Sequence, residues 1–254
     1  MTALFLTPDW PVPATVRALT TLRAGGVSHA PWASLNFGQR TPDEPYALAE
    51  NLRRLIAAAQ LPAAPQWLQQ VHGTAVCDLD QDSEQRTADA AVTSRTAVVC
   101  AIQTADCLPV LLATSDGSVI AAAHAGWRGL AAGVLQATVQ SLRARATRAT
   151  DIVAWLGPAI SPAHYEVGAD VREAFLQSDP GAAPGFLANA RGRWQCDLYA
   201  LARRALGAAG VDEVLGGEHC SFAETGRFFS HRRDGHLPGG TGRMATLIWR
   251  VPEG

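Results

Sequence analysis

The sequence lacks the features that mark several classes of protein. Its apolar runs fall short of the roughly 20 residues that a membrane-spanning helix needs, and its first residues, MTALFLTPDWPVPATV, carry no basic segment of the kind that opens a signal peptide. With a formal net charge of −2, it has no overall basic character that would indicate nucleic-acid binding. Its five cysteines include no CxxC pair, which favours free thiols in a reducing compartment. We therefore expect a cytoplasmic protein without a membrane or nucleic-acid partner.

What the sequence does contain is typical of a globular enzyme. Of its 254 residues, 48% are hydrophobic and 17% are charged, and this length allows one large domain or two small ones. No internal repeat or low-complexity tract divides the chain, so we expect residues 1–254 to form a single domain. The sequence leaves both a monomer and a homodimer open.

Hydrophobic periodicity predicts that helices and strands alternate along the chain. Helices are expected over 47–60, 128–146, 169–177 and 196–210, and strands over 67–76, 90–103, 151–160 and 244–251. Residues 178–186 are rich in proline and glycine and are expected to form a loop. This alternation is typical of an α/β or α+β fold with mixed sheets.

The segment QTADCLPVLLATSDGSVIAAAHAGWRG predicts a β-hairpin that brings two reactive side chains together. A two-residue loop at Asp116-Gly117, a strong turn signal, places His124 opposite Pro109, and a four-residue loop gives the same register. Because alternate residues of a strand share a face, Cys107 and His124 then become diagonal neighbours about 7–8 Å apart, whereas a three-residue loop would put them on opposite faces. Since proline cannot donate to a ladder, Pro109 predicts an edge strand or one unpaired position.

These two side chains have two interpretations. A cysteine and a histidine on strands are often core residues, but a shared face followed by glycines is typical of a functional site. His72, in the segment QVHG, is a third candidate, because a catalytic zinc site uses three protein ligands and one open position. Spacing alone does not connect His72 with the hairpin.

Several motifs resemble those of one known family. QVHGTAV, ADAAVT, TADCLPVLL, HAGWRG and GPAISPAHYEV are similar to motifs of the bacterial laccase-domain family, as are TLRAGGVS, SLNFG, SHRRDG and TGRMATLIW nearer the ends. Members of that family have been called polyphenol oxidases, purine nucleoside phosphorylases and peptidoglycan editing factors. The resemblance implies an α-β-β-α sandwich of mixed sheets flanked by helices. It also implies a zinc site formed by His72, Cys107 and His124.

The resemblance further implies a reaction. A zinc-dependent purine nucleoside phosphorylase would take phosphate together with adenosine, inosine, guanosine or methylthioadenosine, and would also deaminate adenosine by activating water. His72, Cys107 and His124 would then be catalytic residues as well as metal ligands. Asp106, beside the cysteine, and Glu166 are the candidates for an acid/base partner.

Phosphorolysis also needs groups that bind the substrates. Arginine side chains, exposed backbone amides and helix N-termini all favour phosphate. The expected contacts to phosphate or nucleoside are Arg23, Asn36, Arg128, Glu166, Arg232, Arg233 and Arg243. Among these, Asn36 has two interpretations, because its amide is equally suited to binding ribose and to capping a turn.

Three alternatives stay open. The first is copper-dependent phenol oxidation of the laccase type: seven histidines are too few for a full multicopper set, but Cu²⁺ could replace Zn²⁺ at the predicted site. The second is a hydrolase that edits peptidoglycan precursors, with Cys107 as the nucleophile and His124 as the base. The third is a metal-binding interaction module without turnover.

Overall fold

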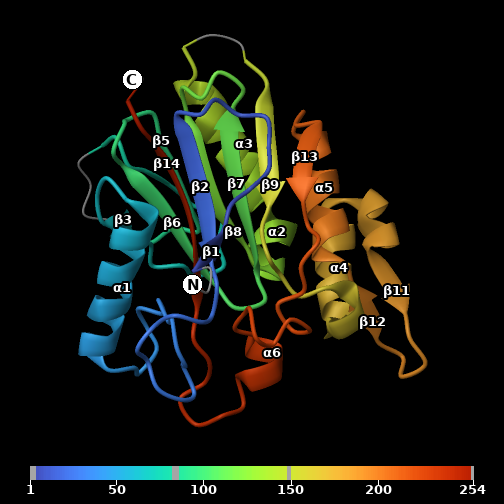
Figure 1. Cartoon of the computed structure of the whole chain (residues 1–254). Helices are drawn as coiled ribbons and strands as arrows, with labels where there is room; N and C mark the ends of the chain where they lie inside the picture. The colour runs from blue at the N-terminus through green and yellow to red at the C-terminus, as the bar shows by residue number, and fades with distance from the viewer. Residues whose placement is uncertain (1–3, 82–85, 148–149, 253–254) are drawn as a thin grey trace.

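The structure is a computed structural model that describes residues 4–81, 86–147 and 150–252. Two large mixed sheets and one small antiparallel sheet form its framework (Figure 1). The five-stranded sheet has the order β1 (Phe5–Leu6), β2 (Val16–Thr21), β14 (Met244–Arg250), β6 (Val99–Thr104) and β3 (Pro65–Gln66). The six-stranded sheet has the order β13 (Glu213–Gly216), β9 (Ile152–Leu156), β7 (Leu108–Thr114), β8 (Ile120–Ala125), β5 (Ala90–Thr93) and β4 (Val76–Asp78). The small sheet has the order β10 (Glu166–Val167), β12 (Trp194–Cys196) and β11 (Phe186–Ala188).

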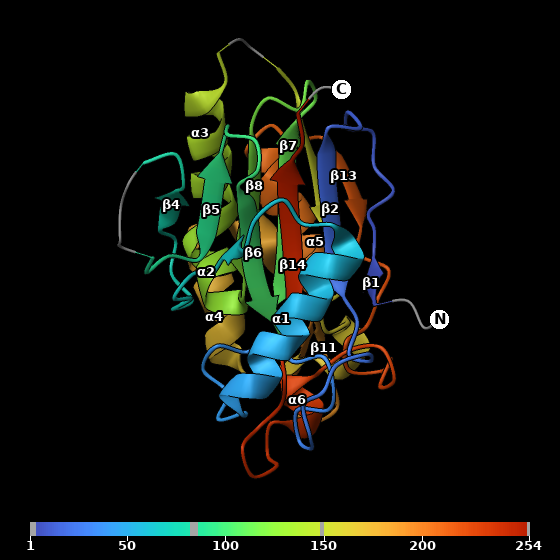
Figure 2. The ribbon, with the colours of Figure 1, turned by 60° about the vertical axis from the view of Figure 1, so that its left-hand side comes forward.

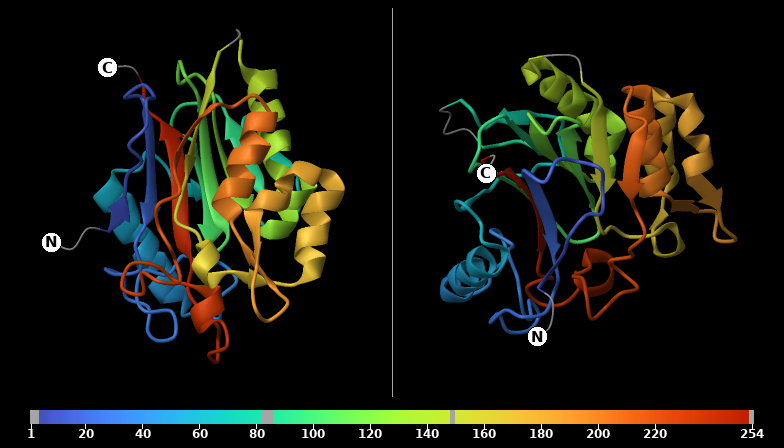
Figure 3. Two further views of the ribbon diagram at one scale, coloured as in Figure 1. Left: turned by 90° about the vertical axis from the view of Figure 1, so that its right-hand side faces the viewer. Right: turned by 45° about the horizontal axis from the view of Figure 1, so that its top comes forward.

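Helices cover the outer faces of the two large sheets. α1 lies across the five-stranded sheet (Figure 2), and α2, α3 and α5 cover the six-stranded sheet (Figure 3). The helices of the described residues are α1 (Pro45–Ala59), α2 (Trp127–Ala132), α3 (Val134–Arg145), α4 (Ala169–Ser178), α5 (Leu198–Ala208) and α6 (His231–Asp234), with short 3₁₀ turns η1 (Pro162–His164) and η2 (Pro180–Gly185). This arrangement confirms the expected α-β-β-α sandwich.

The strand sequences explain why both faces of the six-stranded sheet are covered. Along β7 (LPVLLAT) every residue is buried. Val110 and Leu112 pack toward the helices, while Leu111 and Ala113 pack toward the other sheet. Successive side chains of a strand point to opposite faces, so a strand that is buried along its whole length needs a layer on each side.

The hairpin has the predicted register. β7 and β8 pair with His124 opposite Pro109. The turn itself spans the four residues 115–118, because the Thr114 amide donates to the Val119 carbonyl (3.0 Å), and this loop length gives the same register. The expectation of an edge strand was wrong, because β7 lies between β9 and β8. Pro109 is accommodated at the end of the ladder to β9, where its carbonyl accepts a hydrogen bond from the Gly157 amide (2.9 Å).

Two predicted strands and one predicted helix differ from the structure. Residues 67–75 form an irregular loop between β3 and β4, and the segment 90–103 forms two strands that belong to different sheets. The expected helix over 128–146 is divided into α2 and α3 by Gly133, whose φ of +98° ends one helix and begins the next. The proline- and glycine-rich segment 178–186 contains η2. The helices over 47–60, 169–177 and 196–210 are confirmed. In the described part of the chain, no helix combines the length and apolar character needed to cross a membrane.

Candidate functional site

Three potential metal ligands converge at one end of the space between the two large sheets. Cys107 directly precedes β7 and His124 lies in β8, and the confirmed register gives both the face that is directed toward the five-stranded sheet. His72 comes from the loop between β3 and β4, where its φ of +62° turns the chain sharply. One donor atom from each of the three residues lies within 4.8 Å of the other two, and Cys107 Sγ is 3.9 Å from His72 Nε2.

Asp89 holds the two histidines in place. Its buried carboxylate accepts a hydrogen bond from Nδ1 of His124 (2.8 Å) and three more from the successive backbone amides of Val71, His72 and Gly73 (3.1, 2.9 and 2.7 Å). Burial alone would raise the pKa of Asp89, but these hydrogen bonds outweigh it and lower that pKa. An ionised carboxylate can only accept, so Nδ1 of His124 must carry the proton, which leaves Nε2 as a donor atom for a metal.

The electrostatics at Cys107 favour a thiolate. Burial by itself would raise the pKa of this thiol, but the adjacent imidazole groups of His124 and His72 lower it to about 6. Burial likewise opposes the protonation of His124, while the negative Cys107 and Asp89 raise its pKa. The two shifts have opposite directions, and together they favour a thiolate at Cys107 beside a protonated His124 imidazole.

The glycines of HAGWRG keep space free around these ligands. A Cβ on Gly126 would lie 2.7 Å from Cδ2 of His72 and 3.1 Å from Sγ of Cys107. A Cβ on Gly129 would lie 2.8 Å from the carbonyl oxygen of Gly73. The start of α2 therefore approaches the His72 loop so closely that a side chain at either glycine would displace the ligands.

A thiolate and two imidazoles, one fixed in its tautomer by a carboxylate, suit Zn²⁺ and also Cu²⁺. The residues present thus fit a resident metal. This donor set alone does not choose between the two ions, since imidazole and thiolate bind both.

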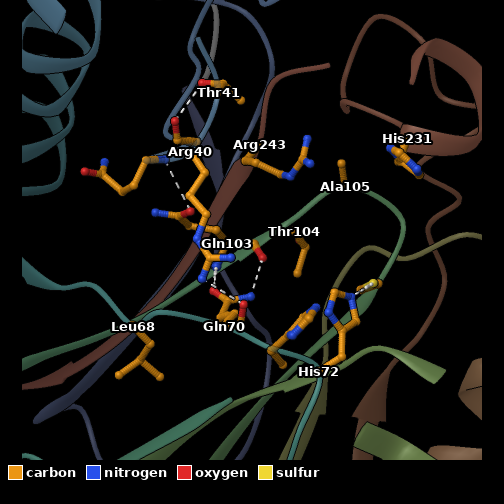
Figure 4. A pocket seen from close by; sticks show the side chains of 14 residues that line it. Arg40, Thr41, Leu68, Gln70, His72, Gln103, Thr104, Ala105, His231 and Arg243 are labelled. Carbon is orange, nitrogen blue, oxygen red and sulfur yellow. Dashed lines mark hydrogen bonds between the residues drawn. The ribbon is translucent and has the colours of Figure 1, made fainter. Parts of the chain in front are cut away.

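The three residues open into a cleft of about 300 Å³ (Figure 4). The loop that follows Asn36, the loop between β3 and β4, and the end of β6 with the residues after it contribute most of its walls. The lining residues are Gly38, Gln39, Arg40, Thr41, Leu68, Gln70, His72, Gln103, Thr104, Ala105, Cys107, His124, His231 and Arg243. The cleft therefore combines the potential metal ligands with two cationic side chains, Arg40 and Arg243.

Arg243 is the one predicted substrate-binding residue that lines this cleft. The carboxylate of Asp106 instead accepts hydrogen bonds from the hydroxyls of Ser221 (2.6 Å) and Ser230 (3.0 Å) and from the backbone amide of Arg232 (2.6 Å). Asp106 is buried. Its hydrogen bonds connect the residue before Cys107 to the segment that carries α6.

The other side chains that were predicted to bind substrate contact protein groups that do not line the cleft. Glu166, in β10, accepts a hydrogen bond from Asn189 (2.7 Å) and pairs with Arg191 (2.5 Å). Arg232 donates to the Glu166 carbonyl (2.9 Å). Arg128 is exposed and stacks on the Trp127 ring at 4.3 Å.

Arg23 and Arg233 both support the C-terminal segment. Arg23 donates to the Ala33 carbonyl (2.8 Å) and lies 3.6 Å from the Asp234 carboxylate. Arg233 pairs with Asp234 and donates to the carbonyls of Ser221, Phe222 and Phe228. These contacts are sufficient to explain both arginines structurally.

Sequence reasoning missed five residues of the site: Asp89, Arg40, Gln70, Gln103 and His231. Asp89 lies in ADAAVT and His231 in SHRRDG, both quoted for the resemblance, but neither motif shows which residue faces the ligands. Gln70 lies two residues before His72, and Arg40 follows SLNFG by two positions. Proximity to a motif was the only signal available for them.

Comparison with known proteins agrees with this arrangement. The family described as "Multi-copper polyphenol oxidoreductase laccase" matches residues 17–251. Purine nucleoside phosphorylase PA4543 of Pseudomonas aeruginosa is 50% identical over 96% of this chain and 98% of its own. Purine nucleoside phosphorylase YfiH of Escherichia coli is 45% identical over 97% and 98%.

Two solved structures have the same fold over nearly the whole chain. Protein NMB0706 of Neisseria meningitidis superposes with a TM-score of 0.89 at 45% identity and covers 98% of this chain and 100% of its own. YlmD of Geobacillus stearothermophilus superposes with a TM-score of 0.87 at 30% identity, over 99% and 98%. Together with the matching family over residues 17–251, these relatives show that the chain belongs to the laccase-like family of YfiH.

Proposed function

We propose that this protein is a metal-dependent purine nucleoside phosphorylase with Zn²⁺ as its resident metal, acting on adenosine, inosine, guanosine and methylthioadenosine and also deaminating adenosine. The observation that carries the proposal is the cleft itself, in which the His72–Cys107–His124 group and the two arginines Arg40 and Arg243 open into the same space. The names of relatives that are 45–50% identical over nearly the whole chain support the same reaction class.

The chemistry of phosphorolysis matches these parts. A phosphate oxygen attacks C1′ of the ribose, the new C1′–O bond forms as the bond from C1′ to N9 breaks, and the purine leaves with the electron pair. The products are ribose 1-phosphate and a purine that takes up one proton. Arginines serve this reaction by holding the phosphate and balancing its charge next to C1′.

The remaining residues hold protons and ligands in place. His72, Cys107 and His124 would hold the Zn²⁺, which when bound supplies a Lewis acid to the cleft. Asp89 keeps the proton of His124 on Nδ1. His231 is the titratable lining residue outside the ligand group and the arginines, so we assign to it the delivery of a proton to the departing purine. Asp106 is assigned a positioning role through Ser221 and Ser230.

Zinc-loaded protein incubated with inosine and phosphate tests this proposal. We expect hypoxanthine and ribose 1-phosphate in equal amounts, and only background formation with the Cys107→Ala variant. Adenosine without phosphate should give inosine and ammonia. If none of the four nucleosides yields products above the variant's background, the proposal is wrong.

The same preparations separate the alternatives. A cysteine hydrolase would keep its activity after chelation and lose it to iodoacetamide, whereas the proposed enzyme loses activity to the chelator. A blue absorbance band in protein purified without added copper would favour the phenol oxidase. Within the described residues, one cluster of three or more histidine, cysteine or acidic side chains is close enough to hold a metal ion, namely His72, Cys107 and His124. This supports a mononuclear site over a multicopper one.

A further inference from the structure

The chain contains 21 arginines and no lysine, so its cationic side chains at neutral pH are almost all guanidinium groups. The permanently charged side chains that can balance a bound phosphate are therefore arginines. Of the arginines in the described residues, the two that line the cleft are Arg40 and Arg243. Of the 21 arginines, these two side chains are therefore the candidates for binding a phosphate in the cleft.

Arg243 is a cation without a matching anion. Its Nη1 donates to the carbonyls of Thr241 (2.7 Å) and Gly242 (3.1 Å), and among the described residues no carboxylate lies within ion-pair distance of its guanidinium. Partial burial lowers its pKa, against the opposing effect of the negative Cys107 and Asp106. Keeping a partly buried charge without a paired anion is costly, and such a cost is typical of a binding site.

The hydrogen bonds of Arg243 leave two of its guanidinium nitrogens available to bind a ligand. Its Nε and Nη2 atoms make no hydrogen bond to the described residues, and these two nitrogens form the fork that binds two oxygens of one phosphate. In Figure 4 the Arg243 side chain extends into the cleft toward Ala105 and His231.

Arg40 approaches the same cleft from the loop after β2. Its side chain is directed toward Gln70 and Gln103 in Figure 4, and Nη2 donates to the Gln70 carbonyl (3.0 Å). Here too, the described residues place no carboxylate within ion-pair distance of the guanidinium. A second arginine with free donors therefore lies on the same cavity as Arg243.

Asn36 links the two arginines. This fully buried amide accepts hydrogen bonds through Oδ1 from the backbone amides of Gly38 and Arg243, both at 2.8 Å. Its Nδ2 donates to Thr41 Oγ1 (2.9 Å), on the other side of Arg40 in the chain. A single side chain thus fixes the loop that carries Arg40 against the start of β14, beside Arg243.

We propose that Arg40 and Arg243 form the phosphate-binding subsite of the cleft and that Asn36 is the residue that positions them. The identity of the anion rests on the proposed phosphorolysis. Asn36 is then a positioning residue that touches no substrate, in place of the contact to ribose that the sequence left open. Arg23, Arg128 and Arg232, which have protein partners outside the lining, take no part in binding phosphate.

Steady-state kinetics with the zinc-loaded full chain test the assignment. With inosine saturating, Arg40→Ala and Arg243→Gln should each raise the KM for phosphate at least tenfold, while the KM for inosine and the zinc content change less than threefold. Asn36→Ala should raise the KM for phosphate with the same selectivity. Arg53→Ala, an exposed arginine paired with Glu50 on α1, is the control and should leave both KM values unchanged.

A second measurement does not depend on turnover. Phenylglyoxal modifies accessible arginines, and mass spectrometry maps the adducts in the presence and absence of inorganic phosphate. Phosphate should reduce the adducts on Arg40 and Arg243 at least fivefold and leave Arg53 unprotected. Protection of Arg23, Arg128 or Arg232 instead, or an unchanged phosphate KM in both arginine variants, overturns the assignment.

The two measurements distinguish the failures. If no nucleoside is turned over but phosphate still protects Arg40 and Arg243, the proposed function is wrong and the anion subsite stands. If phosphorolysis occurs and neither arginine is protected, the subsite assignment is wrong and the function stands.

Discussion

Two buried aspartates lie next to the proposed metal ligands and bind different parts of the molecule. Asp89 directly precedes β5 and directs its carboxylate to His124 and the His72 loop. Asp106 directly precedes Cys107 in the chain, yet its carboxylate binds Ser221, Ser230 and the amide of Arg232. The chain bends at Asp106, whose φ is +83°, and this turns its side chain away from Cys107. Adjacency to a proposed ligand in sequence is therefore a poor guide to contact with it.

The largest expected effect is that of Asp89→Asn on metal affinity. An amide at this position loses the charge that holds Nδ1–H of His124, and its NH₂ group would oppose the backbone amides of Val71, His72 and Gly73. We expect zinc affinity to fall by about 10- to 100-fold, as for other partners of metal-bound histidines. Competition with a chromophoric chelator measures it. An affinity within threefold of the parent protein would show that Asp89 does not orient the ligands.

Asp106→Asn should lower the stability of the fold and leave the zinc affinity unchanged. Asparagine tolerates the φ of +83° at this position, so the change removes the charged acceptor without adding backbone strain. Losing hydrogen bonds from Ser221, Ser230 and Arg232 to a charged group should lower the free energy of unfolding by about 2–3 kcal/mol. Urea denaturation measures this loss, while the chelator assay should show zinc affinity within threefold. If zinc affinity falls as far as in Asp89→Asn, the distinction between the two carboxylates is wrong.

The difference between these aspartates also shows what the sequence could predict. The positions of Cys107 and His124 depend on one local turn, and the Asp116-Gly117 signal was sufficient to place them on one face. The faces of β7 and β8 followed from the same register. Local turn chemistry therefore placed two of the three proposed ligands on one face from the residues alone, and the resemblance supplied the third.

His72 could not be placed in this way, because a long-range contact holds its loop. The segment 67–76 has the composition of a strand, but Gln70 replaces strand pairing with its side chain. Its Oε1 accepts from the amide of Gln103 (2.8 Å), and its Nε2 donates to the carbonyl of Gln103 (2.9 Å). The carboxylate of Asp89 then binds the next three amides. Side-chain hydrogen bonds between segments that are distant in sequence leave no periodic signal.

The arginines show the same limitation. Sequence motifs favoured Arg23, Arg128, Arg232, Arg233 and Arg243. Of these only Arg243 lines the cleft, and Arg40, which also lines it, was not predicted. Which guanidinium groups stay free depends on partners such as Asp234 and Trp127 that only the packed structure assigns. Whether an arginine is free to bind a substrate therefore depends on whether another side chain of the folded protein already contacts its guanidinium group.

Gly126→Ala tests how closely the ligands are packed and should have an intermediate effect. The added Cβ would lie 2.7 Å from His72 and 3.1 Å from Cys107, so the His72 loop must shift. We expect zinc affinity to fall by a factor of about ten, within the range for disturbed ligand shells. Gly207→Ala is the matched control: in α5 a Cβ there meets nothing within 4 Å, and alanine should stabilise the helix by about 0.5–1 kcal/mol. Equal affinities in both variants would contradict the close contact.

The smallest effect concerns Cys107 in the metal-free protein. Iodoacetamide reacts with thiolates, so with a pKa of about 6 the alkylation rate of Cys107 should rise as the pH passes through 6 and reach a plateau above it. The buried Cys196, whose pKa burial raises to about 12, should stay unreactive over the same range. Asp89→Asn weakens the His124 imidazolium and should move the midpoint upward by less than one pH unit, while Asp106→Asn should leave it in place. Mass spectrometry of the two cysteine peptides gives the rates. A midpoint that moves in Asp106→Asn and not in Asp89→Asn would show that Asp106, despite its hydrogen bonds to Ser221 and Ser230, is the carboxylate that controls the charge of the site.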